Sequence, residues 1–290
     1  MGKYEPLAST LLYGGPGAGK SALAVSAFWN WRKREQVANG KWITFGAEDN
    51  PALMVPEEFR HTEKGTSLRL TSPLLDSQAF LDQFDLISRK LLLDAGQGKH
   101  LDVLVIDGLS EFDLLFEETY KGSGGEDDSG NFGKWNGLLS QMFSMMMRTT
   151  HTALGCHIIM TARVMEKKKA KQTKRATMAG DPGFLDFDYY PSMRGSFRLH
   201  MPHYFSMVLY METRQARVGD KVQPVHIVNM VRNGDFHVKN QWEWPWIQSG
   251  RPSSVANPMW PSLWKMIAGA IEDGKERFTE TTEEAIIEEK

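Results

Sequence analysis

Short apolar runs separated by helical patterns recur along the chain. Four runs have the length and composition of buried strands, and they lie at residues 10–13 (TLLY), 42–46 (WITFG), 101–106 (LDVLVI) and 157–160 (HIIM). Apolar residues spaced three and four positions apart predict helices over residues 22–34, 134–148 and 263–271. Strands that alternate with helices indicate an α/β fold with a mainly parallel central sheet flanked by helices.

Other segments lack this periodicity. Residues 122–133 (GSGGEDDSGNFG) predict a flexible loop, and residues 163–195 predict a second loop of a length that is usually functional. Strands are expected again at residues 205–211 and 225–231, before a tryptophan-rich segment that is broken by proline. Residues 272–290 carry eight acidic and three basic side chains, which is typical of a solvated tail. We therefore divide the chain into a core, residues 1–250, and a C-terminal helical extension with an acidic tail, residues 251–290.

The composition is that of an ordinary globular protein. Among 290 residues, 34 Lys and Arg against 36 Asp and Glu leave a net charge of −2, which excludes a uniformly basic nucleic-acid binder. No apolar stretch approaches the ~20 residues of a membrane span, and no secretory signal is visible, so we expect a cytoplasmic protein without a membrane partner. The single cysteine, Cys156, excludes an intramolecular disulfide and a multi-cysteine metal site.

A glycine-rich segment follows the first predicted strand directly. Residues 14–21 (GGPGAGKS) match the pattern G-x-x-x-x-G-K-[ST], in which backbone N–H groups wrap phosphate oxygens at the start of a helix. We expect ATP here, with Lys20 on the β- and γ-phosphates and Ser21 on Mg²⁺. The predicted nucleotide-binding residues are Gly14, Gly15, Pro16, Gly17, Ala18, Gly19, Lys20, Ser21 and Ala22.

Carboxylates at the ends of other strands are candidates for holding the metal and activating water. Asp107 ends the LDVLVI run, where it can hold Mg²⁺ or serve simply as a turn residue. Gly108 follows it instead of a glutamate, so the water-activating carboxylate must come from elsewhere. Glu48 is our preferred candidate because the carboxyl ends of neighbouring parallel strands face one crevice, with Asp49 and Glu111 as competitors.

The order of these motifs resembles the RecA-like P-loop ATPases. More narrowly, it is similar to phage recombination ATPases of the Sak-four single-strand-annealing type over about residues 8–240. Beside the glycine-rich segment, the resemblance rests on FGAED at 45–49, VLVIDGLSEF at 103–112, GKWNGLLSQ at 133–141, HIIMTAR at 157–163, and YYPSMRGSFR at 189–198 leading into YFSMVLYMET at 204–213. It implies a RecA-like core.

The resemblance also implies roles for individual residues. Lys20 and Ser21 would bind nucleotide and Mg²⁺, Glu48 would activate water, and Asp107 would be the second carboxylate on the metal side. Thr161 or Arg163 falls where RecA-like proteins carry a polar sensor of the γ-phosphate. The DNA-facing loops would be residues 120–133 and 164–194.

The charge of these two loops differs in sign. Residues 163–175 carry seven basic side chains against Glu166, for a net charge of +6. Aromatic residues in the same loop, Phe184, Phe187, Tyr189 and Tyr190, are candidates for stacking on bases, and a solvated loop is the alternative interpretation. The predicted DNA-binding residues are Lys167, Lys168, Lys169, Lys171, Lys174 and Arg175. The region around the first loop is acidic, with a net charge of −6, and either a basic neighbouring subunit or a metal would suit it.

Two further features concern partners. Arg232, after a late strand, is a candidate arginine finger for the ATP of an adjacent subunit, which requires a homo-oligomer, or an ordinary surface arginine. The acidic tail is a candidate contact for a single-strand-binding or replication protein.

Together these features favour a DNA-stimulated ATPase that binds single-stranded DNA and promotes annealing or recombination, in the host cytoplasm if the chain is encoded by a phage. A nucleotide or nucleoside kinase and a nucleotide-gated assembly or packaging ATPase are the alternatives.

Overall fold

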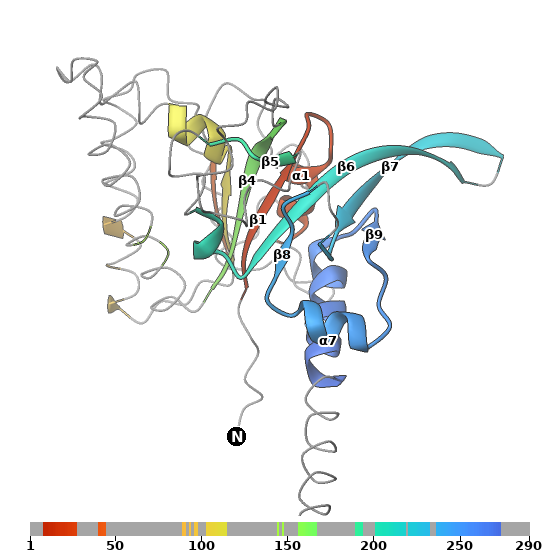
Figure 1. Cartoon of the computed structure of the whole chain (residues 1–290). Coiled ribbons are helices and arrows are strands. Elements are labelled where there is room, and N and C mark those ends of the chain that lie inside the picture. Colours follow the sequence, from red (N-terminus) through yellow and green to blue (C-terminus); the bar gives the residue numbers. More distant parts are fainter. Residues whose placement is uncertain are drawn as a thin grey trace, which may run out of the picture.

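The computed structural model describes residues 8–27, 40–44, 89–90, 93, 96–97, 103–114, 144, 147, 156–166, 189–193, 201–218, 220–232 and 236–273. These residues build one nine-stranded sheet in the order β2-β3-β4-β1-β6-β7-β9, with β5 paired to β4 and β8 to β6 (Figure 1). The strands β2 (Gly40–Thr44), β3 (Val103–Asp107), β4 (His157–Glu166), β1 (Ser9–Gly14) and β6 (Met207–Val218) all run parallel. The predicted α/β fold with a mainly parallel sheet is confirmed.

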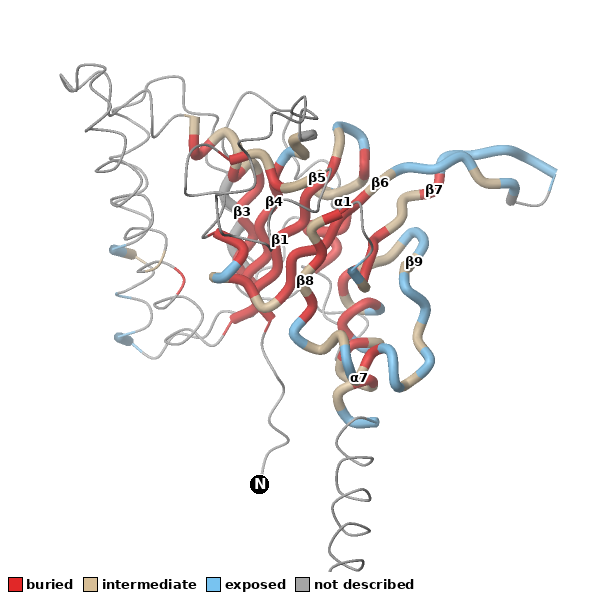
Figure 2. Tube along the Cα trace, in the orientation of Figure 1, coloured by how far each residue is buried: buried red, intermediate tan, exposed pale blue. Residues whose placement is uncertain are grey.

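The centre of the sheet is apolar on both faces. Every residue of β1 and β3 is buried, as their continuous apolar sequences predicted (Figure 2). The strands predicted at residues 10–13 and 157–160 are therefore confirmed, as is the described part, residues 103–106, of the strand predicted at 101–106, although β4 continues six residues beyond Met160. Arg163 and Val164, which the sequence reading placed in a loop, extend this strand, and β5 (Tyr189–Pro191) pairs with its end. The expectation of a loop over all of residues 163–195 is thus wrong for residues 163–166 and 189–191.

The carboxyl ends of the parallel strands lie level with one another. Gly14 at the end of β1 is opposite Arg163 on β4 and Met211 on β6, and Thr44 at the end of β2 is opposite Asp107 on β3. Five residues separate the end of β1 from the start of helix α1 (Lys20–Ser26). This register brings the glycine-rich loop and Asp107 to the same edge of the sheet, where open α/β folds bind ligands.

A long antiparallel hairpin extends the sheet beyond β6. Strand β7 (Lys221–Asn229) pairs with β6 from Tyr210 to Val218, and the outer half of this β6–β7 hairpin is exposed where it projects from the body (Figures 1 and 2). The strands predicted at residues 205–211 and 225–231 correspond only to its buried half. The outer half has no buried face, so its sequence carries no alternation of apolar and polar residues.

The chain beyond residue 250 belongs to the same core. Strand β9 (Ser254–Ala256) pairs with β7, and the helix at residues 260–273 buries Trp260, Leu263, Trp264 and Ile267 in the cluster that contains β1. The Trp260 backbone N–H donates to Ser26 Oγ at the end of α1, 2.7 Å away. The structure therefore places residues 254–273, which the sequence reading set apart as an extension, in one sheet and one hydrophobic core with the rest.

Short elements complete the described chain. They are the 3₁₀ helix η4 (Met201–Tyr204), strand β8 (Lys239–Asn240) and helix α7 (Glu243–Gln248). Pro245 does not break the tryptophan-rich segment as predicted, because it lies in the first turn of α7, where its missing N–H needs no partner.

Four aromatic rings pack together from three strands and from Phe236. Tyr210 stacks on Phe236 with ring centroids 3.9 Å apart, and Tyr13 and Tyr189 pack against Tyr210. Burial raises the pKa of the Tyr13 phenol, which stays protonated and donates to the Tyr189 carbonyl at 3.4 Å. Tyr189, expected to stack on bases, instead has its ring engaged in this cluster.

Candidate nucleotide site

The glycine-rich loop leaves β1 between β4 and β6. A Cβ atom on Gly14 would lie 2.1 Å from the Met211 carbonyl oxygen, so only glycine fits at this point of the sheet. Gly17 and Gly19 have φ angles of 70° and 86°, a conformation that favours glycine. The loop closes into α1 when Leu23 N–H donates to the Gly19 carbonyl at 2.9 Å.

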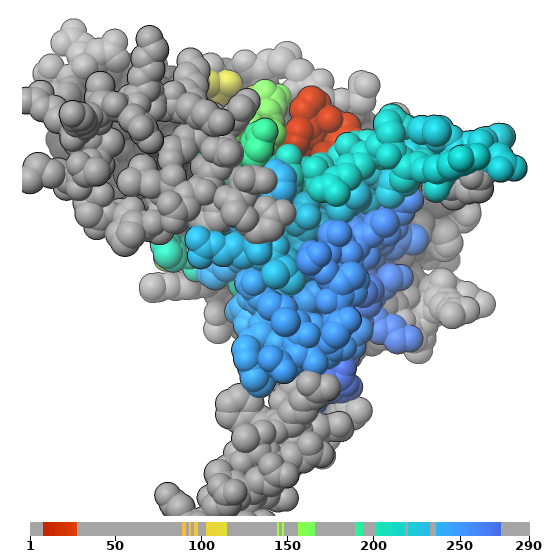
Figure 3. All heavy atoms as spheres, turned by 45° about the vertical axis from the view of Figure 1, so that its right-hand side comes forward, coloured from red at the N-terminus to blue at the C-terminus, as the bar shows by residue number. Residues whose placement is uncertain are grey.

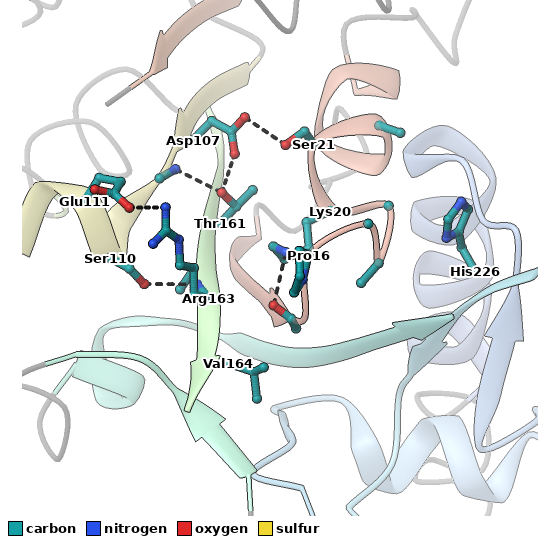
Figure 4. Close-up of a pocket in the computed structure, with 17 residues that line it drawn as sticks. Pro16, Lys20, Ser21, Asp107, Ser110, Glu111, Thr161, Arg163, Val164 and His226 are labelled. Carbon is teal, nitrogen blue, oxygen red and sulfur yellow. Dashed lines mark hydrogen bonds and ion pairs between the residues drawn. The ribbon is translucent and has the colours of Figure 1, made fainter. Parts of the chain in front are cut away.

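A pocket of about 770 Å³ opens over this loop (Figure 4). In the space-filling view the N-terminal segment with the loop reaches the surface between the β4 segment and the β6–β7 hairpin (Figure 3). All the predicted P-loop residues except Gly15 line the pocket, together with Asp107 and Thr161. Its other lining residues are Gly108, Ser110, Glu111, Ala162, Arg163, Val164 and His226.

Lys20 is held over the loop from which it projects. Its Nζ donates to the carbonyls of Gly15, 2.8 Å away, and Gly14, 3.1 Å away. The ammonium group is thus placed inside the phosphate cradle, where it can exchange these carbonyls for phosphate oxygens. This is the geometry expected of the P-loop lysine.

A chain of hydrogen bonds joins α1, β3 and β4 at the side of the pocket. Ser21 Oγ donates to Asp107 Oδ2 at 2.9 Å, and Thr161 Oγ1 donates to Asp107 Oδ1 (Figure 4). Thr161 also accepts the Gly108 N–H at 3.0 Å. Thr161, the candidate γ-phosphate sensor, therefore orients the buried Asp107 carboxylate.

The oxygens of Ser21 and Asp107 fit a Mg²⁺ site. A hydroxyl and a carboxylate 2.9 Å apart are the hard donors that Mg²⁺ prefers, and this ion usually takes its remaining ligands from water and substrate phosphates. Among the residues that the structure describes, no three His, Cys, Asp or Glu side chains come together as a metal cluster, so the nucleotide and water would supply the other ligands. A bound Mg²⁺ would neutralise charge on the β- and γ-phosphates.

The residue after Asp107 must turn the chain sharply. Gly108 has a φ of 96°, and its carbonyl accepts the N–H groups of Glu111 and Phe112 at the start of the helix at residues 109–114. A glutamate here would be strained, which gives a physical reason for the missing acidic neighbour of Asp107.

An ion pair lies beside this metal end of the pocket. Arg163 on β4 pairs with Glu111 on the helix after β3, and Ser110 accepts the Arg163 N–H at 2.9 Å. Ser110 Oγ donates to the Ser192 carbonyl beyond β5 at 2.8 Å. Glu111, a competing candidate for water activation, thus lines the pocket, but its carboxylate is paired with Arg163, the other candidate γ-phosphate sensor.

Several predicted site residues lie outside the described residues. They are Glu48 and the six basic residues Lys167, Lys168, Lys169, Lys171, Lys174 and Arg175. The pairing of Thr44 with Asp107 does show that β2, four residues before Glu48, ends beside the metal-side carboxylate.

Arg232 follows β7 and is not among the described residues that line the nucleotide pocket. Strand β7 runs antiparallel to β6 and ends at Asn229, which is opposite Tyr210. The Arg232 side chain is exposed, and its N–H donates to Glu243 Oε1 at 3.4 Å. Burial, with Arg232 nearby, lowers the pKa of His237 to about 4. The role of Arg232 as an arginine finger for an adjacent subunit stays a prediction.

Sequence reasoning missed two residues of the β6–β7 hairpin, Thr213 and His226. They are opposite each other in the hairpin and contact the glycine-rich loop, and His226 lines the pocket. No motif marks them, because their position depends on the register of two strands that follow the loop by about 200 residues.

The fold and this pocket define a P-loop nucleotide-binding domain. The chain matches the AAA domain family (AAA_24) over residues 8–241, and it belongs to that family of P-loop ATPases, which bind ATP and typically Mg²⁺. No curated protein matches the chain. A solved structure from a study of a prototypical ATPase of the type III secretion system of pathogenic bacteria is similar, with a TM-score of 0.44 and 12% sequence identity. The similarity covers 70% of this chain and 50% of the solved chain, so this chain spans about half the length of the solved ATPase.

Among the described helices, none is long and apolar enough to cross a membrane.

Proposed function

We propose that the chain is a RecA-like ATPase that binds single-stranded DNA beside its nucleotide site and promotes annealing or recombination. The narrower similarity to phage proteins of the Sak-four type, a homo-oligomeric state and a location in the host cytoplasm belong to this proposal. ATP binding itself follows from the family and the pocket.

The observation that carries the proposal is the way the basic segment is anchored. Strand β4 passes the pocket at Arg163 and Val164, and its continuation leads directly into residue 167. The chain returns at β5, which pairs antiparallel with the same end of β4. The residues that flank this segment, Glu166 and Tyr189, are therefore paired with each other at the end of the strand that lines the pocket.

The charge of this segment suits a phosphate backbone. Residues 167–175 contain six Lys and Arg and no acidic residue, whereas Arg163 and Glu166 belong to β4. Phe184, Phe187 and Tyr190 remain candidates for stacking on bases. A cationic segment anchored beside an ATP site would allow nucleotide state and strand binding to influence each other.

The acidic region before the first loop is partly engaged within the protein. Glu111 pairs with Arg163, and Asp113 is buried in the helix at residues 109–114. These two carboxylates are therefore weaker obstacles to a phosphate backbone than the sequence alone implied.

The test is ATP hydrolysis with and without single-stranded DNA, alongside a panel of nucleoside and nucleotide phosphate acceptors. We expect hydrolysis to rise when DNA is added. A phosphorylated acceptor would instead indicate a kinase. Slow turnover that neither DNA nor acceptor changes would indicate a nucleotide-gated assembly or packaging ATPase.

A variant tests the basic segment directly. Replacing Lys167, Lys168, Lys169 and Lys171 together by alanine should weaken binding of single-stranded DNA. Because each neutralised phosphate contributes ~0.7 to the log–log salt slope on single strands, the slope should fall by up to about 3. Fluorescence anisotropy of a labelled oligonucleotide at several salt concentrations measures both quantities.

The matched control replaces the same four lysines by arginine, which keeps the charge. This variant should retain the affinity and the slope. An alanine variant that binds DNA with unchanged affinity and slope would refute the assignment of this segment.

A further inference from the structure

His226 lines the nucleotide pocket but belongs to β7, which contributes no other described residue to the pocket. The other described lining residues belong to β1, the P-loop, α1, β3 with its following helix, and β4. His226 is half-buried on β7, two strands away from β1. Its ring lies so close to the P-loop that a Cβ atom on Gly19 would be 2.9 Å from the imidazole Cγ.

Hydrogen bonds fix the imidazole against the loop. Thr213 Oγ1 donates to the Gly17 carbonyl at 3.1 Å and lies 3.1 Å from His226 Nδ1. Because the one hydroxyl proton of Thr213 is used on Gly17, Nδ1 must be the donor in its contact with Thr213. Nε2 is then left for another partner, and none of the described residues hydrogen-bonds it.

The backbone of His226 is also held in place. Its N–H donates to Asn257 Oδ1 at 2.9 Å, and its carbonyl accepts the Asn257 N–H at 2.6 Å. Asn257 follows β9 with a φ of 44°, a conformation for which asparagine is one of the better-suited residues. The ring is therefore supported by the sheet on one side and by the P-loop on the other.

The direction of a bound nucleotide follows from the metal end of the pocket. Ser21, Asp107 and Thr161 lie on the β3 and β4 side of β1, and Lys20 lies inside the loop (Figure 4). The β- and γ-phosphates with Mg²⁺ belong at that side. The nucleoside end must then extend from the P-loop in another direction. Among the described walls of the pocket, the β6–β7 side with His226 lies away from the metal end.

We propose that His226 is a nucleotide-binding residue that contacts the nucleoside end of the bound nucleotide, its ribose or base, while its partner Thr213 holds the phosphate loop directly through Gly17. Two side chains of one cross-strand pair thus have separable roles. The inference concerns the nucleotide site alone and is independent of whether DNA is the partner.

The experiment compares ATP with inorganic tripolyphosphate, which has the phosphates without the nucleoside. Isothermal titration calorimetry of the full chain with Mg²⁺ and without DNA measures both affinities. His226→Ala should weaken ATP binding by about tenfold, the value of one good hydrogen bond or ring contact, and leave tripolyphosphate binding unchanged. In steady-state hydrolysis the same variant should raise KM for ATP far more than it lowers kcat.

Thr213→Val is the matched control. It removes the hydrogen bond to Gly17 together with the contact to His226, so it should weaken the binding of both ATP and tripolyphosphate, whereas His226→Ala should weaken ATP binding alone. Equal weakening of both ligands by His226→Ala would overturn the proposal, because it would show that the ring acts only through the shape of the P-loop. Unchanged ATP binding would overturn it as well.

Two measurements keep the proposal testable if His226→Ala does not fold. His226→Gln retains a polar side chain of similar length. Its affinity for ATP should lie between those of the wild type and His226→Ala, and its affinity for tripolyphosphate should be unchanged. The wild-type protein should itself bind ATP more tightly than tripolyphosphate, and equal affinities would contradict a contact with the nucleoside.

Discussion

Replacing Lys20 by alanine is expected to lower kcat for ATP hydrolysis by about 10²–10³-fold, the typical effect of removing one preorganised group that stabilises transition-state charge. The structure places the Lys20 ammonium inside the cradle, held by the carbonyls of Gly14 and Gly15. No other described lysine lines the pocket, so no side chain of the same kind can replace it. A phosphate-release assay at saturating ATP and Mg²⁺ measures the change.

The control for this variant is Lys265→Ala. Lys265 is exposed on the helix at residues 260–273 and is not part of the pocket, so its removal changes the net charge equally and should leave kcat unaffected. The thermal unfolding midpoint of Lys20→Ala should be recorded beside its activity, because the lysine also holds two loop carbonyls. Wild-type hydrolysis by a folded Lys20→Ala protein would mean that the nucleotide turns over at another site.

The phosphate end of the site could be predicted because its information is local. The residues from Gly14 to Ser21 form one continuous motif, and Asp107 ends a strand whose apolar sequence marks it as buried. The rule that parallel strands end at one edge of the sheet then brings the two parts together without knowledge of the strand order. The observed hydrogen bond between Ser21 and Asp107 fulfils that expectation.

The nucleoside side could not be predicted, because it depends on register. Thr213 and His226 meet only because β6 and β7 pair so that these two residues are opposite each other. The outer hairpin is exposed and carries no apolar alternation, so no pattern in the sequence indicates that the two strands are this long. A shift by one residue would turn both side chains to the other face of the hairpin.

The end of β4 shows a second limit of prediction from the sequence. The segment that starts at Arg163 lacks apolar periodicity, which predicts that the chain leaves the sheet there. In the structure Glu111 neutralises Arg163, and Ser110 accepts its backbone N–H, so the strand can continue. The partners that permit this come from the helix after β3, about 50 residues earlier in the sequence.

Asp107→Asn should lower kcat by at least about 100-fold, since a catalytic metal contributes several kcal/mol of charge stabilisation and ~3 kcal/mol corresponds to about two orders of magnitude in rate. The substitution keeps the size of a side chain that is only 5% exposed, and one oxygen can still accept from Thr161 or Ser21. The thermal midpoint without ligands should therefore change little, whereas the rise in midpoint produced by Mg²⁺ and ATP should shrink. Hydrolysis measured against Mg²⁺ concentration should show a higher requirement for the metal.

Variants of Thr161 separate the charge of Asp107 from its orientation. Thr161→Val keeps the carboxylate but removes the hydroxyl that donates to it and that accepts the Gly108 N–H. Because a buried donor and a buried acceptor then lose their partner, the free energy of unfolding should fall by about 1–3 kcal/mol, and kcat should fall less than in Asp107→Asn. Thr161→Ser retains the hydroxyl and should keep most of the wild-type stability and most of the wild-type kcat. If Asp107→Asn hydrolysed ATP with the wild-type dependence on Mg²⁺, Asp107 would be a turn residue at the end of β3, and the metal site would have to be built from other carboxylates.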